Sequence, residues 1–384
     1  MINWVLFKYK VLILKIWSTL KLIIKTSGRL SKYPNFVLQF EKQFATDHDC
    51  EYGVTYCNGS SAIEAALFAV GVQKGDEVLV STCSVHSTAM SIISLEAQPV
   101  YVDIEADSLN FDPEEIDRKV TDNTVCLIVV HLWGNPADMI RIRAKAKKYN
   151  LKIVEDCSHA HGATINGQKV GSWGDVGCFS LQGYKAVSAA EGGIAITNNK
   201  EYHNRLSLYG HFGRNKIVIE KSVYRELLAT GIGTKRRANP LGINMAAVDL
   251  KYLDKKNKLQ RKAIDRFEQL TKNIATLDKV TVVHQAIKGG FYPGHPVVVK
   301  PGVDKQEVLN QLKVRLKRHA LFGRPYFFKV PDPHYHQMKH MNDLDYGASL
   351  KNAIDEPPLS VNISIPKLET TESVLERIIF IPIR

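Results

Sequence analysis

Two side chains near the middle of this chain could do chemistry together: the carboxylate of Asp156 and the amine of Lys185. Asp156 follows the short β-prone run 152–154, and α/β sheets keep their ligands at the carboxyl ends of parallel strands. Lys185 lies between Gly183 and the small-residue run 189–193, which lets the backbone approach a bulky group closely. Taken singly, either residue is more often a strand-end cap or a solvated surface residue than a catalytic one. The motifs around them favour the functional interpretation.

The stretch from Val154 to Thr197 resembles the cofactor site of the DegT/DnrJ/StrS-type sugar aminotransferases, which use pyridoxal phosphate (PLP). The resemblance rests on motifs in fixed order: D-C-S-H-A-H-G from Asp156, G-S-W-G-D-V-G-C-F-S ending at Ser180, then Lys185 and E-G-G. It implies that Lys185 forms the Schiff base with PLP and later acts as a general base. It also implies that Asp156 pairs with the pyridine nitrogen and that Ser180 reaches the phosphate.

A phosphate-binding motif precedes this stretch. The run N-G-S-S-A from Asn58 opens a helix that we expect to end at Ala69. Glycine and small hydroxyl residues at a helix N-terminus suit a phosphate, because free backbone N–H groups and the helix dipole point toward it. A plain N-cap would explain the run equally well on its own. The match to the family's phosphate loop implies that Gly59, Ser60 and Ser61 bind the cofactor.

Some positions depart from the family pattern. The aromatic residue that stacks on the cofactor aligns with Val85, and the adjacent His86 is the alternative stacking residue. His159 replaces a glutamine that contacts the ring oxygen, and histidine can donate the same hydrogen bond. In the loop 233–241, Arg237 matches and Lys235 replaces an asparagine, so a cation suited to phosphate is kept. The resemblance implies that this loop reaches the partner's cofactor in a homodimer, although basic runs are usually solvated turns.

Strand-like and helical segments alternate from residue 52 onward, which predicts an α/β fold with helices on both faces of a mostly parallel sheet. The resemblance identifies this fold as the large domain of a fold-type I PLP-dependent transferase, followed by a small α+β C-terminal domain. We expect strands at 52–56, 77–80, 100–103, 125–130 and 152–154. The expected divisions are an N-terminal basic amphipathic helix at 1–34, a PLP-binding large domain at 35–245, a linking helix at 246–276 and the small domain at 277–384. The family normally continues with a further helix, so a shortened C-terminus is expected.

The most unusual segment is the helical pattern from Asn3 to Lys25. Its apolar residues recur every three or four positions and predict one apolar face, made of Val5, Tyr9, Leu12, Ile16, Leu20 and Ile23. The opposite side is predicted to carry Lys8, Lys15, Ser18, Lys21 and Lys25. No charge-free stretch is long enough to cross a bilayer, and no small-residue cleavage site follows. Two alternatives stay open: an interfacial helix on an anionic membrane, or a helix packed on the protein's own body or its dimer partner.

Composition and charge narrow the function further. The net charge is +12, but the first 32 residues hold seven basic residues and no acid, so the remainder carries only +5. Such a mild excess suits phosphate-bearing ligands, and the absence of any nucleic-acid-binding motif argues against a nucleic-acid partner. The six cysteines are widely spaced, which indicates buried free thiols in a reducing compartment and argues against disulfides and a zinc site. The histidines at 334 and 336 are better explained by a polar loop than by a metal site.

The sequence and the resemblance together predict a cytoplasmic PLP-dependent aminotransferase of amino-sugar or cell-surface polysaccharide biosynthesis. We expect it to move an amino group from glutamate or glutamine to a keto-sugar, nucleotide-linked or cyclitol, with a peripheral contact to the inner face of the membrane through residues 3–25 left open. A PLP-dependent sugar dehydratase of the same family is the alternative enzyme. Lys185 counts against it, because those enzymes are expected to carry histidine there. A membrane-attached PLP-binding protein without turnover is the non-enzymatic alternative, and a test for catalysis separates the two.

Overall fold

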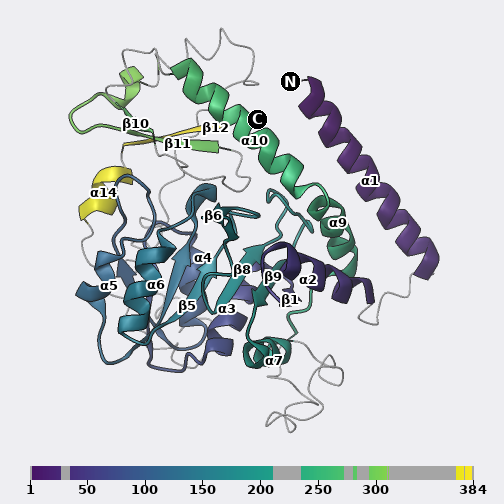
Figure 1. Cartoon of the computed structure of the whole chain (residues 1–384), viewed down its shortest axis with the longest axis horizontal. Helices are drawn as coiled ribbons and strands as arrows, with labels where there is room; N and C mark the ends of the chain where they lie inside the picture. Colours follow the sequence, from purple (N-terminus) through teal and green to yellow (C-terminus); the bar gives the residue numbers. More distant parts are fainter. Residues whose placement is uncertain are drawn as a thin grey trace, which may run out of the picture.

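The computed structural model describes residues 2–26, 35–210, 235–271, 280–282, 294–308, 310, 369–375 and 377–382. Its centre is a seven-stranded sheet of order β1-β9-β8-β5-β4-β2-β3 (Figure 1). Neighbours pair in parallel except β9, which runs antiparallel to β1 and to β8. The strands are β1 (Tyr52–Tyr56), β2 (Glu77–Ser81), β3 (Gln98–Val102), β4 (Thr124–Val130), β5 (Lys152–Asp156), β8 (Val176–Ser180) and β9 (Gly193–Thr197). The predicted α/β fold with a mostly parallel sheet is confirmed.

Both faces of this sheet are buried, as the continuous apolar strands require. In β4, Cys126 and Ile128 join one hydrophobic core and Leu127 and Val129 join the other, because successive side chains of a strand point to opposite faces. The first core is covered by α3 (Gly59–Val70), α4 (His86–Ile93) and α7 (Lys200–Leu208). The second is covered by α2 (Asn35–Asp47), α5 (Glu114–Lys119), α6 (Met139–Lys148) and α9 (Pro240–Leu250). Polar residues at the strand ends are thereby held on a rigid layer.

Short elements complete the large sheet's surroundings. The 3-10 helix η1 (Leu132–Gly134) follows β4, and a two-stranded hairpin of β6 (Thr164–Ile165) and β7 (Gln168–Lys169) lies between β5 and β8.

All six cysteines are free thiols, and five of them are buried. Burial raises the pKa of the Cys83 thiol to about 12, so this thiol is kept protonated and inert.

The described part of the range 246–276, expected to form a single linking helix, is not one continuous helix. The structure has two helices, α9 and α10 (Leu253–Thr271), separated by a turn at Lys251 and Tyr252. The backbone N–H of Tyr252 donates to the carbonyl of Asp249 at 2.9 Å and closes the turn. Leu250 and Leu253 are both buried at this turn, so packing rather than a glycine or proline sets the break.

A second, three-stranded antiparallel sheet combines β10 (Val280–Val282), β11 (Gly294–Val299) and β12 (Ile378–Pro382). Helix α14 (Glu369–Leu375) ties this region to the large sheet, because the Thr371 hydroxyl donates to Oδ1 of Asp103 at 2.6 Å. The C-terminal domain boundary at 277 stays a prediction. The histidines at 334 and 336 lie outside the described residues.

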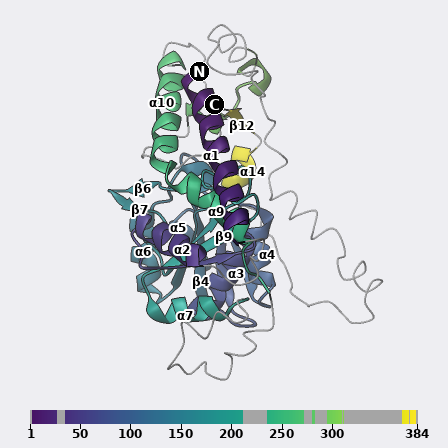
Figure 2. The same ribbon diagram turned by 90° about the vertical axis from the view of Figure 1, so that its right-hand side faces the viewer.

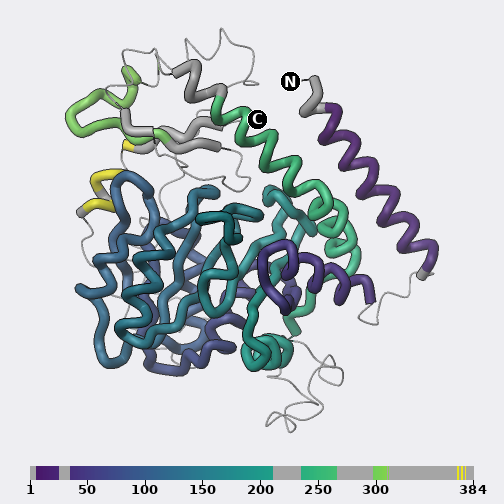
Figure 3. Tube along the Cα trace, in the orientation of Figure 1, coloured from purple at the N-terminus to yellow at the C-terminus, as the bar shows by residue number. Residues whose placement is uncertain are grey.

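Helix α1 (Ile2–Thr26) confirms the helical pattern predicted at the N-terminus. It lies alongside α9 and α10 at the edge of the molecule, as the trace in Figure 3 shows. No helix within the described part of the chain is long and apolar enough to cross a membrane.

Candidate active site

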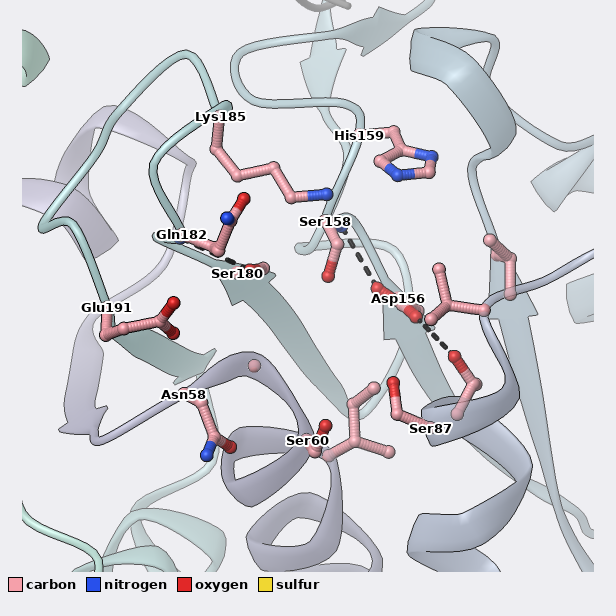
Figure 4. A pocket seen from close by; sticks show the side chains of 15 residues that line it. Asn58, Ser60, Ser87, Asp156, Ser158, His159, Ser180, Gln182, Lys185 and Glu191 are labelled. Atoms are coloured by element: carbon pink, nitrogen blue, oxygen red, sulfur yellow. Dashed lines mark hydrogen bonds between the residues drawn. The ribbon is translucent and has the colours of Figure 1, made fainter. Parts of the chain in front are cut away.

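Asp156 ends β5 at the carboxyl edge of the large sheet, where it is buried. Its carboxylate is held from two sides. The Thr88 hydroxyl donates to Oδ2 at 3.0 Å, and the Ser158 backbone N–H donates to Oδ1 at 3.0 Å (Figure 4). The carboxylate therefore has a fixed orientation toward the space in front of the sheet.

The preceding residue, Glu155, has a structural role. It is fully buried, and its two oxygens accept hydrogen bonds from the backbone N–H groups of Gly171, Trp173 and Gly174 at 2.6–2.8 Å. The ring of His131 is a further partner, with Nε2 2.9 Å from Oε2. Although His131, Glu155 and Cys157 lie close enough to share a metal ion, the carboxylate is already saturated by these bonds. This network fixes the end of β5 and so the position of Asp156.

Lys185 lies on the loop between β8 and β9, and its amine points toward Ser158 and Asp156 (Figure 4). The loop is folded back on itself, because the N–H of Leu181 donates to the carbonyl of Gly192 at 2.8 Å. Burial lowers the pKa of the Lys185 amine to about 8, an effect that the nearby Asp156 carboxylate partly opposes. At pH 7 about one tenth of this amine is therefore uncharged, far more than at the usual pKa of 10.5.

Two helices hold this loop from outside. The N–H of Ser188 donates to Oδ2 of Asp249 on α9 at 3.0 Å, and Nζ of Lys256 on α10 donates to the carbonyl of Ala186 at 2.6 Å. Side chains on both sides of Lys185 in the loop are also buried, including Leu181, Ala186, Val187 and Ala189. The backbone around the amine is therefore fixed, which a catalytic group requires.

The N-terminus of α3 faces the same space. Asn58 caps it, since its side chain accepts from the N–H of Ser61 at 2.8 Å, and the first-turn N–H groups have no acceptor within the helix. The strands β8 and β9 come very close to this N-terminus. A Cβ at Gly59 would lie 2.9 Å from Cβ of Ser180, and one at Gly193 would lie 2.2 Å from the carbonyl oxygen of Asn58. Glycine is required at both positions for this arrangement.

These elements enclose a cavity of about 260 Å³. Seven of the predicted site residues line it: Gly59, Ser60, Val85, Asp156, His159, Ser180 and Lys185. The sequence missed eight further lining residues: Asn58, Ile63, Ser87, Thr88, Val130, Ser158, Gln182 and Glu191. Asn58, Ser158 and Glu191 stood inside the quoted motifs, and their motif positions were the signal that could have found them.

Four predicted site residues do not line this cavity. Ser61 lies on a buried side of α3, where Nη1 of Arg236 donates to its hydroxyl at 3.2 Å. His86 is the first residue of α4, while Val85 before it does line the cavity. Lys235 and Arg237 are exposed, on either side of the inward-turned Arg236.

The residues present fit PLP. The cavity has an amine for the aldehyde, a carboxylate at the opposite position for a ring nitrogen, and hydroxyls with a helix N-terminus for the phosphate. No Phe, Tyr or Trp is among the described lining residues, so the imidazole of His159 is the single aromatic ring there.

Known proteins resemble this chain in sequence and in fold. A sequence model of the DegT/DnrJ/EryC1/StrS aminotransferase family matches residues 20–378. GDP-perosamine synthase of Escherichia coli O157:H7 is 30% identical over 303 residues, which are 78% of this chain and 79% of that protein. The L-glutamine:2-deoxy-scyllo-inosose aminotransferase of Streptoalloteichus tenebrarius is 37% identical over 229 residues, 58% of this chain and 54% of that protein. The solved structure of E coli GDP-4-keto-6-deoxy-D-mannose-3-dehydratase with bound hydrated PLP superposes with a TM-score of 0.76 at 20% identity, over 96% of this chain and 92% of that one. At that identity the structural likeness shows the fold alone.

Proposed function

The chain belongs to the DegT/DnrJ/EryC1/StrS aminotransferase family, and we propose that it transfers an amino group from glutamate or glutamine to the keto group of a nucleotide-linked sugar. Its class is that of a PLP-dependent sugar aminotransferase. The finer assignment is supported by one relative named for a GDP-linked amino sugar and another named for glutamine as donor. The observation that carries the proposal is the convergence of Lys185 and Asp156 on one cavity, with the α3 N-terminus at its other end.

In this proposal, Lys185 and Asp156 divide the proton chemistry. PLP, when bound, supplies the electron sink that stabilises a carbanion at the substrate's amine-bearing carbon. Asp156, oriented by Thr88 and the Ser158 N–H, holds a proton at the pyridine nitrogen. Nζ of Lys185 takes and returns the proton at the substrate carbon, and its pKa of about 8 suits a base near neutral pH.

The remaining lining residues would bind and orient the cofactor. The N–H groups at the start of α3 and the hydroxyls of Ser60 and Ser180 are placed to bind the phosphate. His159 would donate a hydrogen bond to the ring oxygen, and Val85 would cover one face of the ring with an apolar surface.

We infer that the active unit is a homodimer. Lys185 is the single lysine or arginine among the described residues that line the cavity, and its amine is assigned to the aldehyde of the cofactor. No second basic side chain in this lining is left to balance a phosphate dianion. Lys235 and Arg237 are exposed on their own chain, where they could reach the partner's phosphate. If a second copy of the chain supplies these basic side chains to the phosphate, both observations are explained.

The dehydratase alternative shares this fold but has no residue in its favour here. A lysine at position 185 suits transfer of an amino group, whereas the dehydratases are expected to carry histidine at this position.

The proposed place of action is the cytoplasm, in amino-sugar biosynthesis, with α1 available for peripheral contact with the membrane's inner face.

A substrate screen tests the proposal. The holoenzyme is incubated with glutamate or glutamine and a panel of GDP-, dTDP- and UDP-linked keto-sugars, and products are read by mass spectrometry. The expected result is replacement of a keto oxygen by an amino group in at least one sugar, absent in Lys185→Ala. Loss of a hydroxyl without gain of nitrogen would support the dehydratase. No conversion of the cofactor by either donor would support a PLP-binding protein without turnover.

A further inference from the structure

Helix α1 packs on the body of the protein with the side that the sequence predicted to be polar. Among its described side chains, Phe7 and Val11 are the buried ones, and the ring of Phe7 meets Tyr252 edge-on at 5.7 Å between centroids. On the same side, Lys15 pairs with Asp249 and the Ser18 hydroxyl donates to Oδ1 of Asn244 at 3.1 Å. The helix is therefore docked, and the side it docks is not its most apolar one.

The predicted apolar face points away from the protein, apart from Val5, whose side chain lies outside the described ones. Tyr9, Leu12, Ile16, Leu20 and Ile23 are all exposed, and other exposed apolar side chains widen the face: Leu6, Ile13, Trp17 and Ile24. Their exposed fractions run from 39% to 76%. In Figure 2 the helix lies in front of α9 on the side that faces the viewer. Single exposed apolar residues are common, but a contiguous row of nine along one helix indicates a binding surface.

We propose that this face of α1 lies in the headgroup region of an anionic membrane, with the enzyme body on the cytoplasmic side. The distribution of charge favours lipid as the occupant. α1 contains no acidic residue in its 25 positions. At 3.6 residues per turn, Lys10 and Lys21 fall along one border of the apolar face and Lys8 falls along the other. Lysines at such borders reach anionic headgroups while the apolar side chains between them enter the acyl boundary.

A second copy of the chain fits this face less well. If two α1 helices packed face to face, their lysine borders would meet with no acid on either helix to compensate. Outside α1, the exposed large apolar side chains of the described chain are Ile140 and Tyr184, which belong to separate elements. The described surface therefore offers no matching apolar patch for a heterologous contact.

Flotation with lipid vesicles tests this proposal on the full-length holoenzyme. We expect wild type to float with vesicles of phosphatidylcholine and phosphatidylglycerol, weakly with phosphatidylcholine alone, and less as salt rises. The double variant Ile16→Glu, Leu20→Glu places two acids at the centre of the face and should lower partitioning about tenfold or more. Lys10→Gln with Lys21→Gln should lower binding to anionic vesicles and leave the weak binding to neutral vesicles unchanged.

The matched control is Ile140→Glu, which puts the same acid at an exposed apolar position outside α1 and should float like wild type. Because all substituted side chains are exposed, the visible spectrum of bound PLP and the unfolding midpoint should stay those of wild type, which checks that each variant is folded. Wild type that does not float, or an Ile16→Glu, Leu20→Glu variant that floats equally, overturns the proposal. A fall in molar mass of that variant by light scattering, without any lipid binding by wild type, would assign the face to a second copy.

Discussion

Nζ of Lys256 donates a 2.6 Å hydrogen bond to the carbonyl oxygen of Ala186, the residue that follows Lys185 in the chain. The same amine pairs with Asp249 at 2.5 Å, and Asp249 also pairs with Lys15 of α1 and accepts the Ser188 N–H. One buried carboxylate thus connects the N-terminal helix to the loop of the proposed catalytic amine. Burial lowers the pKa of Lys256, which the Asp249 charge counteracts.

Removing the Asp249 charge should destabilise the protein. Asp249→Asn leaves two largely buried lysines, Lys15 and Lys256, without their carboxylate, which should lower the free energy of unfolding by about 3 kcal/mol. Urea unfolding followed by circular dichroism measures this change. Asp254→Asn, at an exposed position on α10, is the control and should stay within about 0.5 kcal/mol of wild type. Equal midpoints for the two variants would contradict the role given to Asp249.

Lys256 should act as a positioning residue. Lys256→Met keeps the stem of the side chain but removes the hydrogen bond to Ala186, so Lys185 should be held less accurately. We expect kcat to fall about tenfold with little change in KM. A merely structural role would leave the pH midpoint of PLP capture at its wild-type value, whereas loosening of the loop should raise it, because a more hydrated amine has a higher pKa.

Lys185 should be the residue that holds PLP covalently. Borohydride reduction of the wild-type holoenzyme should fix one cofactor per chain on the peptide containing Lys185, and Lys185→Ala should lose both the visible absorption band and the adduct. Lys251→Ala, at an exposed lysine near the α9–α10 turn, should keep both. A reduced adduct on any other lysine of the wild-type protein would show that the assignment is wrong.

The pKa of Lys185 should set the pH dependence of PLP capture by the apoprotein. The uncharged amine is the nucleophile, and burial holds its pKa at about 8, below the usual value of 10.5. The capture rate should therefore rise about tenfold per pH unit below pH 8 and level off above it. Stopped-flow absorbance between pH 6 and about 9.5 measures this profile. A rate that keeps rising about tenfold per pH unit up to the top of this range, without levelling off, would mean that the amine keeps a pKa near 10.5 and is not buried in solution.

Asp156 and Thr88 should contribute unequally to catalysis. Asp156→Asn cannot keep the pyridine nitrogen protonated and should lower kcat about 100- to 10,000-fold. Thr88→Val removes one hydrogen bond to the carboxylate, 3.0 Å long, and should cost about tenfold. Thr88→Ser restores the hydroxyl and should recover most of that loss. If Thr88→Val and Thr88→Ser are equally impaired, the methyl packing rather than the hydrogen bond matters.

The dimer proposal predicts complementation between chains. Lys185→Ala removes the amine of one site, and Arg237→Ala removes the cation proposed for the partner's phosphate. Mixed after partial unfolding, the two inactive variants should recover up to about a quarter of wild-type activity, because random pairing leaves one complete site in half of the dimers. A fully active monomer by light scattering would rule out the shared site.

The layers of the fold and the main residues of the candidate site could be predicted from local sequence. Apolar runs such as β4 can be buried on both faces only within a covered sheet, so the α/β fold follows from local pattern. Asp156 and Lys185 could be found from their motifs because both lie in short segments whose residue types are dictated by one ligand. Their partner Thr88 could not be found in this way, since it lies 68 residues from Asp156 and meets it only through the parallel order of β2, β4 and β5.

The side of α1 that faces the protein could not be predicted from its own sequence. The apolar periodicity was correct, yet the side carrying Lys15 and Ser18 is the docked one. On α9, the buried carboxylate of Asp249 pairs with Lys15, and the side-chain amide of Asn244 accepts a hydrogen bond from Ser18. The break between α9 and α10 could not be predicted from the sequence either, because no glycine or proline marks it. The packing of Leu250 and Leu253 creates it. Local sequence reports how apolar a face is. The charges and shapes supplied by distant residues decide what that face meets.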